Sequence, residues 1–155
     1  MVICRNPKTG KWLAVDESRD RGWWIPGGGV DAGETFRTAA KRECLEEAGV
    51  EIVLKGIIAM DHHMFDKQGV KMRVVFYAEP ADPDCIPKQK ADKESNGAEW
   101  LSLQEFAMKE NIRGDELIIY GQYLEKGGQI TPLSFMCEGH DGAAEMDSSK
   151  KVFTI

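Results

Sequence analysis

Residues 28–50 constrain this chain most, because they join a glycine-rich turn to a segment with the local features of a helix. The turn is Pro26-Gly27-Gly28-Gly29. Residues 35–48 hold good helix formers and neither proline nor glycine, and Gly49 supplies a stop just past them. We therefore expect a loop followed by a helix of about four turns.

Three glutamates of this predicted helix, Glu43, Glu46 and Glu47, share one arc of its surface. Glu46 lies about 60° to one side of Glu43, and Glu47 about 40° to the other. Like charges at this spacing repel each other, and Arg42 offsets part of the repulsion. A divalent cation would offset more, since hard ions such as Mg²⁺ or Mn²⁺ bind carboxylate oxygens. Taken alone, the run is also compatible with a solvated acidic helix face.

The spacing of the charged residues and glycines decides between these alternatives. The fixed positions are Gly28, Glu34, Arg42, Glu43, Glu46, Glu47 and Gly49. At each of these positions the stretch resembles the signature, or box, of the Nudix hydrolases. One position departs from it, because Cys44 stands where the family usually has a larger aliphatic residue. Cysteine packs as a small hydrophobe, so the departure leaves the resemblance intact.

The resemblance implies an enzyme, a pyrophosphohydrolase that needs Mg²⁺ or Mn²⁺, and it suggests roles for the box residues. Glu46 and Glu47 are expected to be the principal metal ligands, and Glu43 a further ligand or the general base. The carbonyl of Gly28 is expected to be a backbone ligand, because a glycine turn lets the main chain approach an ion. Arg42 is expected to pair with a helix carboxylate and hold it in position.

Residues outside the box are further candidates. Glu94 lies in a region from which many Nudix proteins draw another acid for a metal or a base, and a plain loop charge is the alternative. Trp24 and Tyr77 could stack on a base, although aromatic side chains near a sheet more often belong to the core. His63 is a candidate for the substrate side.

Alternating strand-like and helical segments predict a mixed-sheet α/β/α sandwich, which the resemblance also implies. Strands are expected at residues 1–4, 11–15, 23–26, 50–60, 70–78 and 98–103, the first two as a hairpin, with a polar loop at residues 61–69. Ser102 is expected to cap a helical turn, and a second amphipathic helix is expected at residues 115–125. The Nudix domain is expected to span residues 1–137, followed by a polar, flexible tail at residues 138–155.

Length and charge limit the classes of function. A chain of 155 residues is long enough for one domain with a real core. Its net charge of −6 argues against an extended nucleic-acid partner or an anionic membrane surface, but not against a small phosphorylated substrate with a metal. The four cysteines show no C-x-x-C pair, which fits free thiols in a reducing compartment. We expect a cytoplasmic protein, with a homodimer left open.

The substrate is approached by elimination. The first proline after the box is Pro80, much too far for the mark of the ADP-ribose group, and the NADH-pyrophosphatase pattern SQPWPFPxS is absent. Gly27 stands where the diphosphoinositol and mRNA-decapping groups usually have lysine. The remaining resemblance is to MutT-like enzymes that act on nucleoside di- or triphosphates, including oxidised ones. Alternatives are a diphosphoinositol polyphosphate or dinucleoside polyphosphate hydrolase, and a non-catalytic Nudix binding module, which usually lacks one of the box glutamates.

Overall fold

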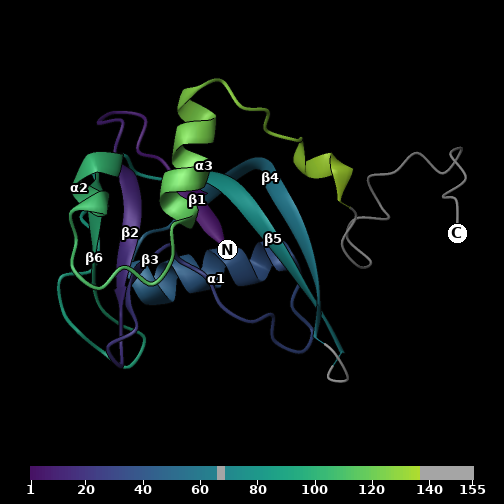
Figure 1. Cartoon of the computed structure of the whole chain (residues 1–155), viewed down its shortest axis with the longest axis horizontal. Helices are drawn as coiled ribbons and strands as arrows, with labels where there is room; N and C mark the ends of the chain where they lie inside the picture. Colours follow the sequence, from purple (N-terminus) through teal and green to yellow (C-terminus); the bar gives the residue numbers. More distant parts are fainter. Residues whose placement is uncertain (66–68, 137–155) are drawn as a thin grey trace, which may run out of the picture.

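The computed structural model describes residues 1–65 and 69–136, except for the side chains of residues 63, 65 and 70 (Figure 1). The expected tail at residues 138–155 and the domain boundary at residue 137 lie outside the described residues. The elements are β1 (Val2–Cys4), β2 (Trp12–Glu17), β3 (Gly22–Trp24), α1 (Phe36–Ala48), β4 (Ile52–Phe65), β5 (Gly69–Pro80), β6 (Ser95–Leu101), α2 (Leu103–Ala107), α3 (Glu116–Glu125) and the 3₁₀ helix η1 (Leu133–Phe135).

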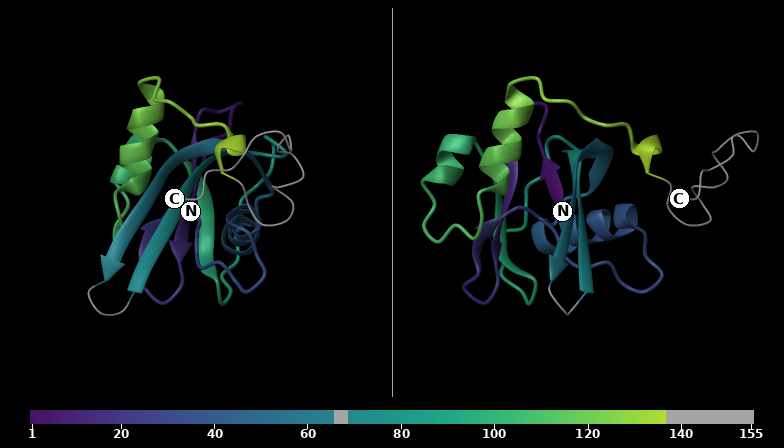
Figure 2. Two further views of the ribbon diagram at one scale, coloured as in Figure 1. Left: turned by 90° about the vertical axis from the view of Figure 1, so that its right-hand side faces the viewer. Right: turned by 45° about the vertical axis from the view of Figure 1, so that its right-hand side comes forward.

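The strands form two three-stranded sheets, ordered β1-β5-β4 and β3-β2-β6. In the first sheet β1 runs parallel to β5, while β4 and β5 are antiparallel, so this sheet is mixed. The second sheet is antiparallel throughout. Helix α1 lies on one side of the strands and α3 on the other (Figure 2). The predicted mixed α/β/α architecture is therefore confirmed, with its strands divided between two sheets.

Two predicted connections are wrong. β1 and β2 do not form a hairpin, because they enter different sheets, and only an isolated bridge between Arg5 and Trp12 joins the two segments among the described residues. The stretch from Asp61 to Phe65 is strand and not loop, since β4 pairs with β5 as far as Phe65 opposite Gly69. Its local polarity suggested a loop, but the partner strand satisfies its backbone groups.

Helix α1 forms where the sequence predicts it, because both of its ends are capped locally. The Thr35 hydroxyl accepts a hydrogen bond from the backbone N–H of Thr38, and the Thr38 side chain in turn accepts from the Thr35 N–H. Gly49 adopts the left-handed conformation with φ of 66°, and its N–H donates to the Leu45 carbonyl at 2.9 Å. The helix of the box thus has a fixed beginning and a fixed end.

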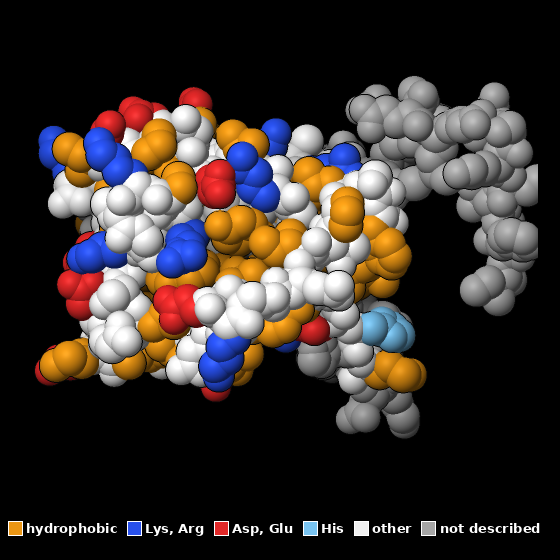
Figure 3. All heavy atoms as spheres, turned by 90° about the horizontal axis from the view of Figure 1, so that it is seen from above, with side chains coloured by type: hydrophobic (Ala, Val, Ile, Leu, Met, Phe, Trp, Pro, Cys, Tyr) orange, Lys and Arg blue, Asp and Glu red, His pale blue; other side chains and the backbone are white. Residues whose placement is uncertain are grey.

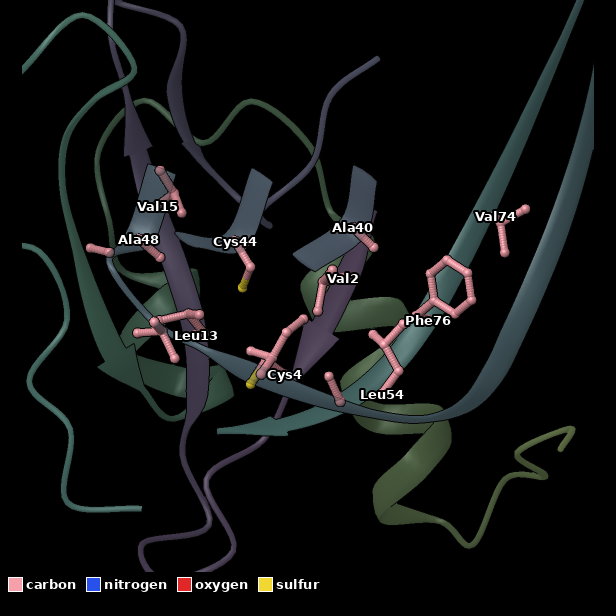
Figure 4. Close-up of a cluster of buried hydrophobic side chains, with 14 of the residues drawn as sticks. Val2, Cys4, Leu13, Val15, Ala40, Cys44, Ala48, Leu54, Val74 and Phe76 are labelled. Carbon is pink, nitrogen blue, oxygen red and sulfur yellow. The ribbon is translucent and has the colours of Figure 1, made fainter. Parts of the chain in front are cut away.

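The core consists of two clusters that share the same strands. In β1, Val2 and Cys4 face the first cluster while Ile3 faces the second. In β2, Leu13 and Val15 face the first cluster and their neighbours the second, as the two-residue period of a strand requires. Figure 4 shows the first cluster, where Ala40, Cys44 and Ala48 of α1 point towards the strands. Cys44 is fully buried and packs there as the expected small hydrophobe.

The face seen in Figure 3 carries side chains of both charges. Basic and acidic side chains are interspersed there with apolar ones. Of the helices described, none is long and apolar enough to cross a membrane.

Candidate active site

The glycine turn and the end of α1 are held together through Glu47. Its carboxylate accepts a hydrogen bond from the backbone N–H of Gly27 at 2.9 Å. Its own carbonyl accepts one from the hydroxyl of Ser95, at the start of β6, at 2.5 Å. Only 7% of Glu47 is exposed. The turn therefore holds the side chain of Glu47, while the helix and the second sheet hold its main chain.

Burial raises the pKa of Glu47 to about 7, against the opposing effect of the Gly27 hydrogen bond. The negative charges of Glu43 and Glu17 raise the pKa further, and the charge of Arg21 lowers it. Glu43 lies one turn earlier in the same helix, whereas Glu17 comes from the end of β2. A cation at this position would stabilise the ionised form of the carboxylate.

Arg42 is the centre of an ion-pair cluster in the box. Its guanidinium donates two hydrogen bonds to Glu34, at 2.9 Å and 3.0 Å. It also donates to Glu43 at 2.8 Å, to Glu46 at 3.0 Å and to the carbonyl of Gly29 at 3.0 Å. The side chain therefore ties the loop before α1 to two of the three helix glutamates.

The glycine at position 28 lies directly against one of these acids. A Cβ atom added to Gly28 would stand 2.6 Å from Cδ of Glu43 and 2.8 Å from its Oε2, too close for a real contact. The main chain of the turn can thus approach the Glu43 carboxylate only because residue 28 has no side chain.

The donor set fits a hard divalent cation in its chemistry. Within residues 1–65 and 69–136, no three His, Cys, Asp or Glu side chains are arranged as a ready-made metal cluster. Glu43 and Glu46 point to Arg42 instead, and Glu47 points to the Gly27 N–H. Their carboxylate oxygens and the bare main chain at Gly28 are nevertheless the donor types that Mg²⁺ and Mn²⁺ prefer.

A cavity of about 570 Å³ opens beside the box. Its wall is formed by Met1, Arg21, Trp24, Gly27, Gly28, Gly29, Val30, Phe36, Ala39, Ala40, Glu43, Lys71, Met72, Arg73, Val74, Phe76 and Arg113. The volume suits a small phosphorylated ligand, since pockets for such ligands measure about 300–1,000 Å³. Four of the residues in this wall are cationic, although the whole chain is acidic.

The predicted site residues outside the box are dispersed. Trp24 lines the cavity and is 9% exposed, and its indole N–H donates to Glu116 at 2.6 Å. Tyr77 packs against the second core cluster and is not part of the cavity wall. Glu94 is half-buried just before β6 and pairs with Lys93 at 3.1 Å. His63 lies in β4, and its side chain is outside the described residues.

Sequence reasoning missed the cationic part of the wall, which comes from Arg21, Lys71, Arg73 and Arg113. These residues precede β3, lie in β5 and precede α3, and none belongs to a recognisable motif. Arg21 lies in a charged stretch before β3, and stretches of this kind are too common to indicate a site.

The chain is similar to known proteins both in sequence and in structure. Residues 1–120 match the NUDIX domain family. The phosphatase NudJ of Escherichia coli K12 is 28% identical over 137 residues, which cover 87% of this chain and 88% of NudJ. A NUDIX hydrolase from Nitrosomonas europaea superposes with a TM-score of 0.67 and 25% identity, over 91% of this chain and 95% of that one. An Ap4A hydrolase from C. elegans shares the fold, with a TM-score of 0.56, 21% identity, and 81% and 96% coverage.

Proposed function

This chain belongs to the Nudix hydrolase family and is a pyrophosphohydrolase; on that premise we propose that it acts on a nucleoside di- or triphosphate, with Mg²⁺ or Mn²⁺ as its cofactor. Nudix hydrolases generally need divalent metals and act on small phosphorylated nucleotides. The observation that supports the proposal is the position of Glu43, at once in the ion-pair cluster of the box and in the wall of a cavity with cationic side chains.

Hydrolysis of a pyrophosphate requires charge neutralisation on the phosphates and an activated water, and the divalent ion supplies both when it is bound. Glu46 and Glu47 would be its principal ligands, with the Gly28 carbonyl beside them. Glu43 would either be a further ligand or take the proton from the attacking water. Arg42 holds Glu43 and Glu46 at a common position, which pre-organises these two glutamates before the cation arrives.

The wall of the cavity supports a nucleotide as the substrate. Val30, Phe36 and Met72 offer apolar surface, while Arg21 and Arg113 offer positive charge for phosphate oxygens. Trp24 lines the same cavity and lies under the guanidinium of Arg113, so its position is compatible with a role in substrate binding. A MutT-like activity on ordinary or oxidised nucleotides accounts for both properties of the cavity.

The test is product release from a panel of substrates by the wild type and by Glu47→Gln, with Mg²⁺, with Mn²⁺ and with EDTA. The panel contains ordinary and 8-oxo nucleoside di- and triphosphates, a dinucleoside polyphosphate and a diphosphoinositol phosphate. We expect one nucleoside di- or triphosphate to be preferred. Its turnover should fall at least 100-fold in Glu47→Gln and vanish in EDTA.

Glu125→Gln, at the exposed end of α3, is the matched control and should retain wild-type turnover. Near wild-type rates in Glu47→Gln would contradict the role given to Glu47. A preference for the diphosphoinositol or dinucleoside compound would overturn the substrate class. Binding of nucleotides without turnover of any panel member would favour the binding module.

A further inference from the structure

A second charged cluster lies at the cavity, outside the box. Its centre is Glu17, the last residue of β2, which is only 2% exposed. Arg113, in the segment before α3, donates from Nη1 to both carboxylate oxygens of Glu17. Arg21 approaches the same carboxylate, with Nη1 at 4.0 Å from Oε1. One buried carboxylate thus faces two arginines.

The two arginines are on the cavity side of this cluster. Both belong to the cavity wall, whereas Glu17 does not. The side chain of Arg113 is 36% exposed and that of Arg21 47% exposed. Because two guanidinium groups share one carboxylate, the cluster has a net charge of about +1 at the cavity. That charge faces the space into which the box would place a phosphorylated substrate.

Arg113 is held in a defined orientation. Its guanidinium lies over the ring of Trp24, 4.1 Å from the centroid. Its backbone N–H donates to the carbonyl of Trp23 at 3.0 Å, and the neighbouring Ile112 forms a bridge with Trp23. A planar guanidinium that is fixed on one face and by one nitrogen keeps its remaining donors for a ligand.

The arginines also lie near the box. Arg21 and Arg113 line the same cavity as Gly28 and Glu43 of the box. The positive groups therefore share one binding space with two of the residues proposed to hold the metal.

From this arrangement we propose that Arg113, together with Arg21, binds the phosphate chain of the substrate, and that Glu17 holds Arg113 in place. This inference rests on the proposed function and names the residues that contact the phosphates. The negative charge of a diphosphate would then be neutralised by two kinds of partner, the arginine pair and the metal ion that the glutamates would bind. The phosphates, and not the base, are the groups recognised, because the cluster has a net positive charge that a neutral base edge would leave unbalanced.

The test is isothermal titration with methylenediphosphonate, a diphosphate analogue that has no base and cannot be hydrolysed, in the presence of Mg²⁺. We expect Arg113→Gln to weaken binding at least 10-fold, because it loses a charged, bidentate donor. Arg113→Lys keeps the positive charge but loses the planar set of N–H donors of the guanidinium group, so it should bind with intermediate affinity. Arg21→Gln, which leaves the pair between Glu17 and Arg113 intact, should weaken binding at least threefold.

Arg5→Gln is the matched control. Arg5 also lies over a tryptophan, 5.1 Å from the centroid of Trp12, but it is not in the cavity wall. Its loss should leave the affinity within twofold of the wild type. Thermal unfolding of every variant identifies any effect that comes from loss of the fold, and Arg21→Gln provides the result if Arg113→Gln does not fold.

Several outcomes separate this inference from the proposed function. Unchanged binding of methylenediphosphonate to folded Arg113→Gln and Arg21→Gln would overturn it, even if the wild type hydrolyses nucleotides. The same titrations are made with α,β-methylene-ADP, which carries a nucleoside. A loss of affinity for this ligand alone, with methylenediphosphonate unaffected, would show that Arg113 contacts the nucleoside and would also overturn the inference. Loss of diphosphonate binding in a chain that hydrolyses no nucleotide would support the arginine site and reject the proposed reaction.

Discussion

At the scale of single residues, the candidate site depends on how closely Arg42 and the glycine turn approach the acids of α1. Arg42 draws Glu43 and Glu46 together, and Gly27 binds Glu47 from the turn. Like charges held so near each other repel, and Arg42 compensates only part of this repulsion. The arrangement therefore keeps three carboxylates in a small region at a cost that a bound cation would offset.

Gly28→Ala should lower kcat/KM at least 10-fold without a large change in stability. The added Cβ would meet the Glu43 carboxylate, whose Cδ is 2.6 Å away, and this end of a flexible side chain would turn aside. Displacement of a reacting group by about 1 Å can cost up to 100-fold in rate. Steady-state kinetics and thermal unfolding measure the two quantities separately.

The neighbouring glycine is the control for this substitution. A Cβ at Gly29 would meet nothing within 4 Å, so Gly29→Ala should keep wild-type kinetics. Equal kinetics for Gly28→Ala and Gly29→Ala would mean that the contact with Glu43 has no role in turnover.

At the scale of elements, Gly49 ends α1 directly after the box glutamates. Gly49 has φ of 66°, a conformation that costs a residue with a Cβ about 1–2 kcal/mol. Gly49→Ala should therefore lower the free energy of unfolding by about 1 kcal/mol or more, as measured by urea denaturation. Gly49→Asn should lose less, since asparagine tolerates the left-handed region. Equal losses in the two variants would contradict this explanation of the helix end.

Helix α2 offers a prediction of pH dependence. The backbone N–H of Ser102, the ammonium of Lys11 and the Ser102 hydroxyl together lower the pKa of Glu105 to about 2. Because the folded pKa is below the ordinary value of 4.5, this carboxylate stabilises the fold fully above about pH 4.5. Its contribution is lost as the pH falls from there towards 2.

Glu105→Gln measures this contribution directly. Its urea midpoint should be below that of the wild type at pH 7, and the difference should shrink as the pH is lowered from 4.5. Lys11→Met removes the ion pair but keeps the bonds to Ser102, so it should reproduce only part of the effect. A difference between wild type and Glu105→Gln that stays constant down to pH 3 would rule out the carboxylate as its source.

At the scale of the whole molecule, the segment after α3 crosses β4 and returns to α1. Ile57 and Thr131 exchange two backbone hydrogen bonds, at 2.8 Å and 2.9 Å. Further on, Arg37 of α1 donates to the carbonyls of Leu133 and Met136, at 2.6 Å and 2.7 Å. The start of α1 is thus connected to β4 through residues that follow the last long helix.

Gly56→Ala tests this connection. Its Cβ would stand 2.6 Å from the carbonyl oxygen of Thr131, a backbone atom that cannot turn aside. We expect a loss of about 1–3 kcal/mol in the free energy of unfolding, from urea denaturation. Hydrogen exchange at the amides of Ile57 and Thr131 should accelerate, and unchanged protection there would contradict the assigned contact.

The sequence predicted those features whose causes lie within a few residues of each other. Helix α1 and its stop at Gly49 follow from local capping, and the structure has both. The helical period also brings Glu43 and Glu46 to one side of the helix, where they share Arg42. The cap of α2 at Ser102 is equally local. The strand partners are different, because polar residues 61–65 and the short β1 gain their places from β5, which the local pattern does not reveal.

By itself, the sequence determined the family, the reaction class and the carboxylates of the box, because the residues that indicate them lie in one continuous stretch, residues 28–50. Only the tertiary structure decided which cations line the cavity beside those carboxylates. Arg21 and Arg113 are far apart in the chain and meet at Glu17, because the segment before α3 pairs with β3. Charge summed along an acidic chain conceals this local positive wall, since electrostatic interactions depend on distance in space and not on order in the sequence.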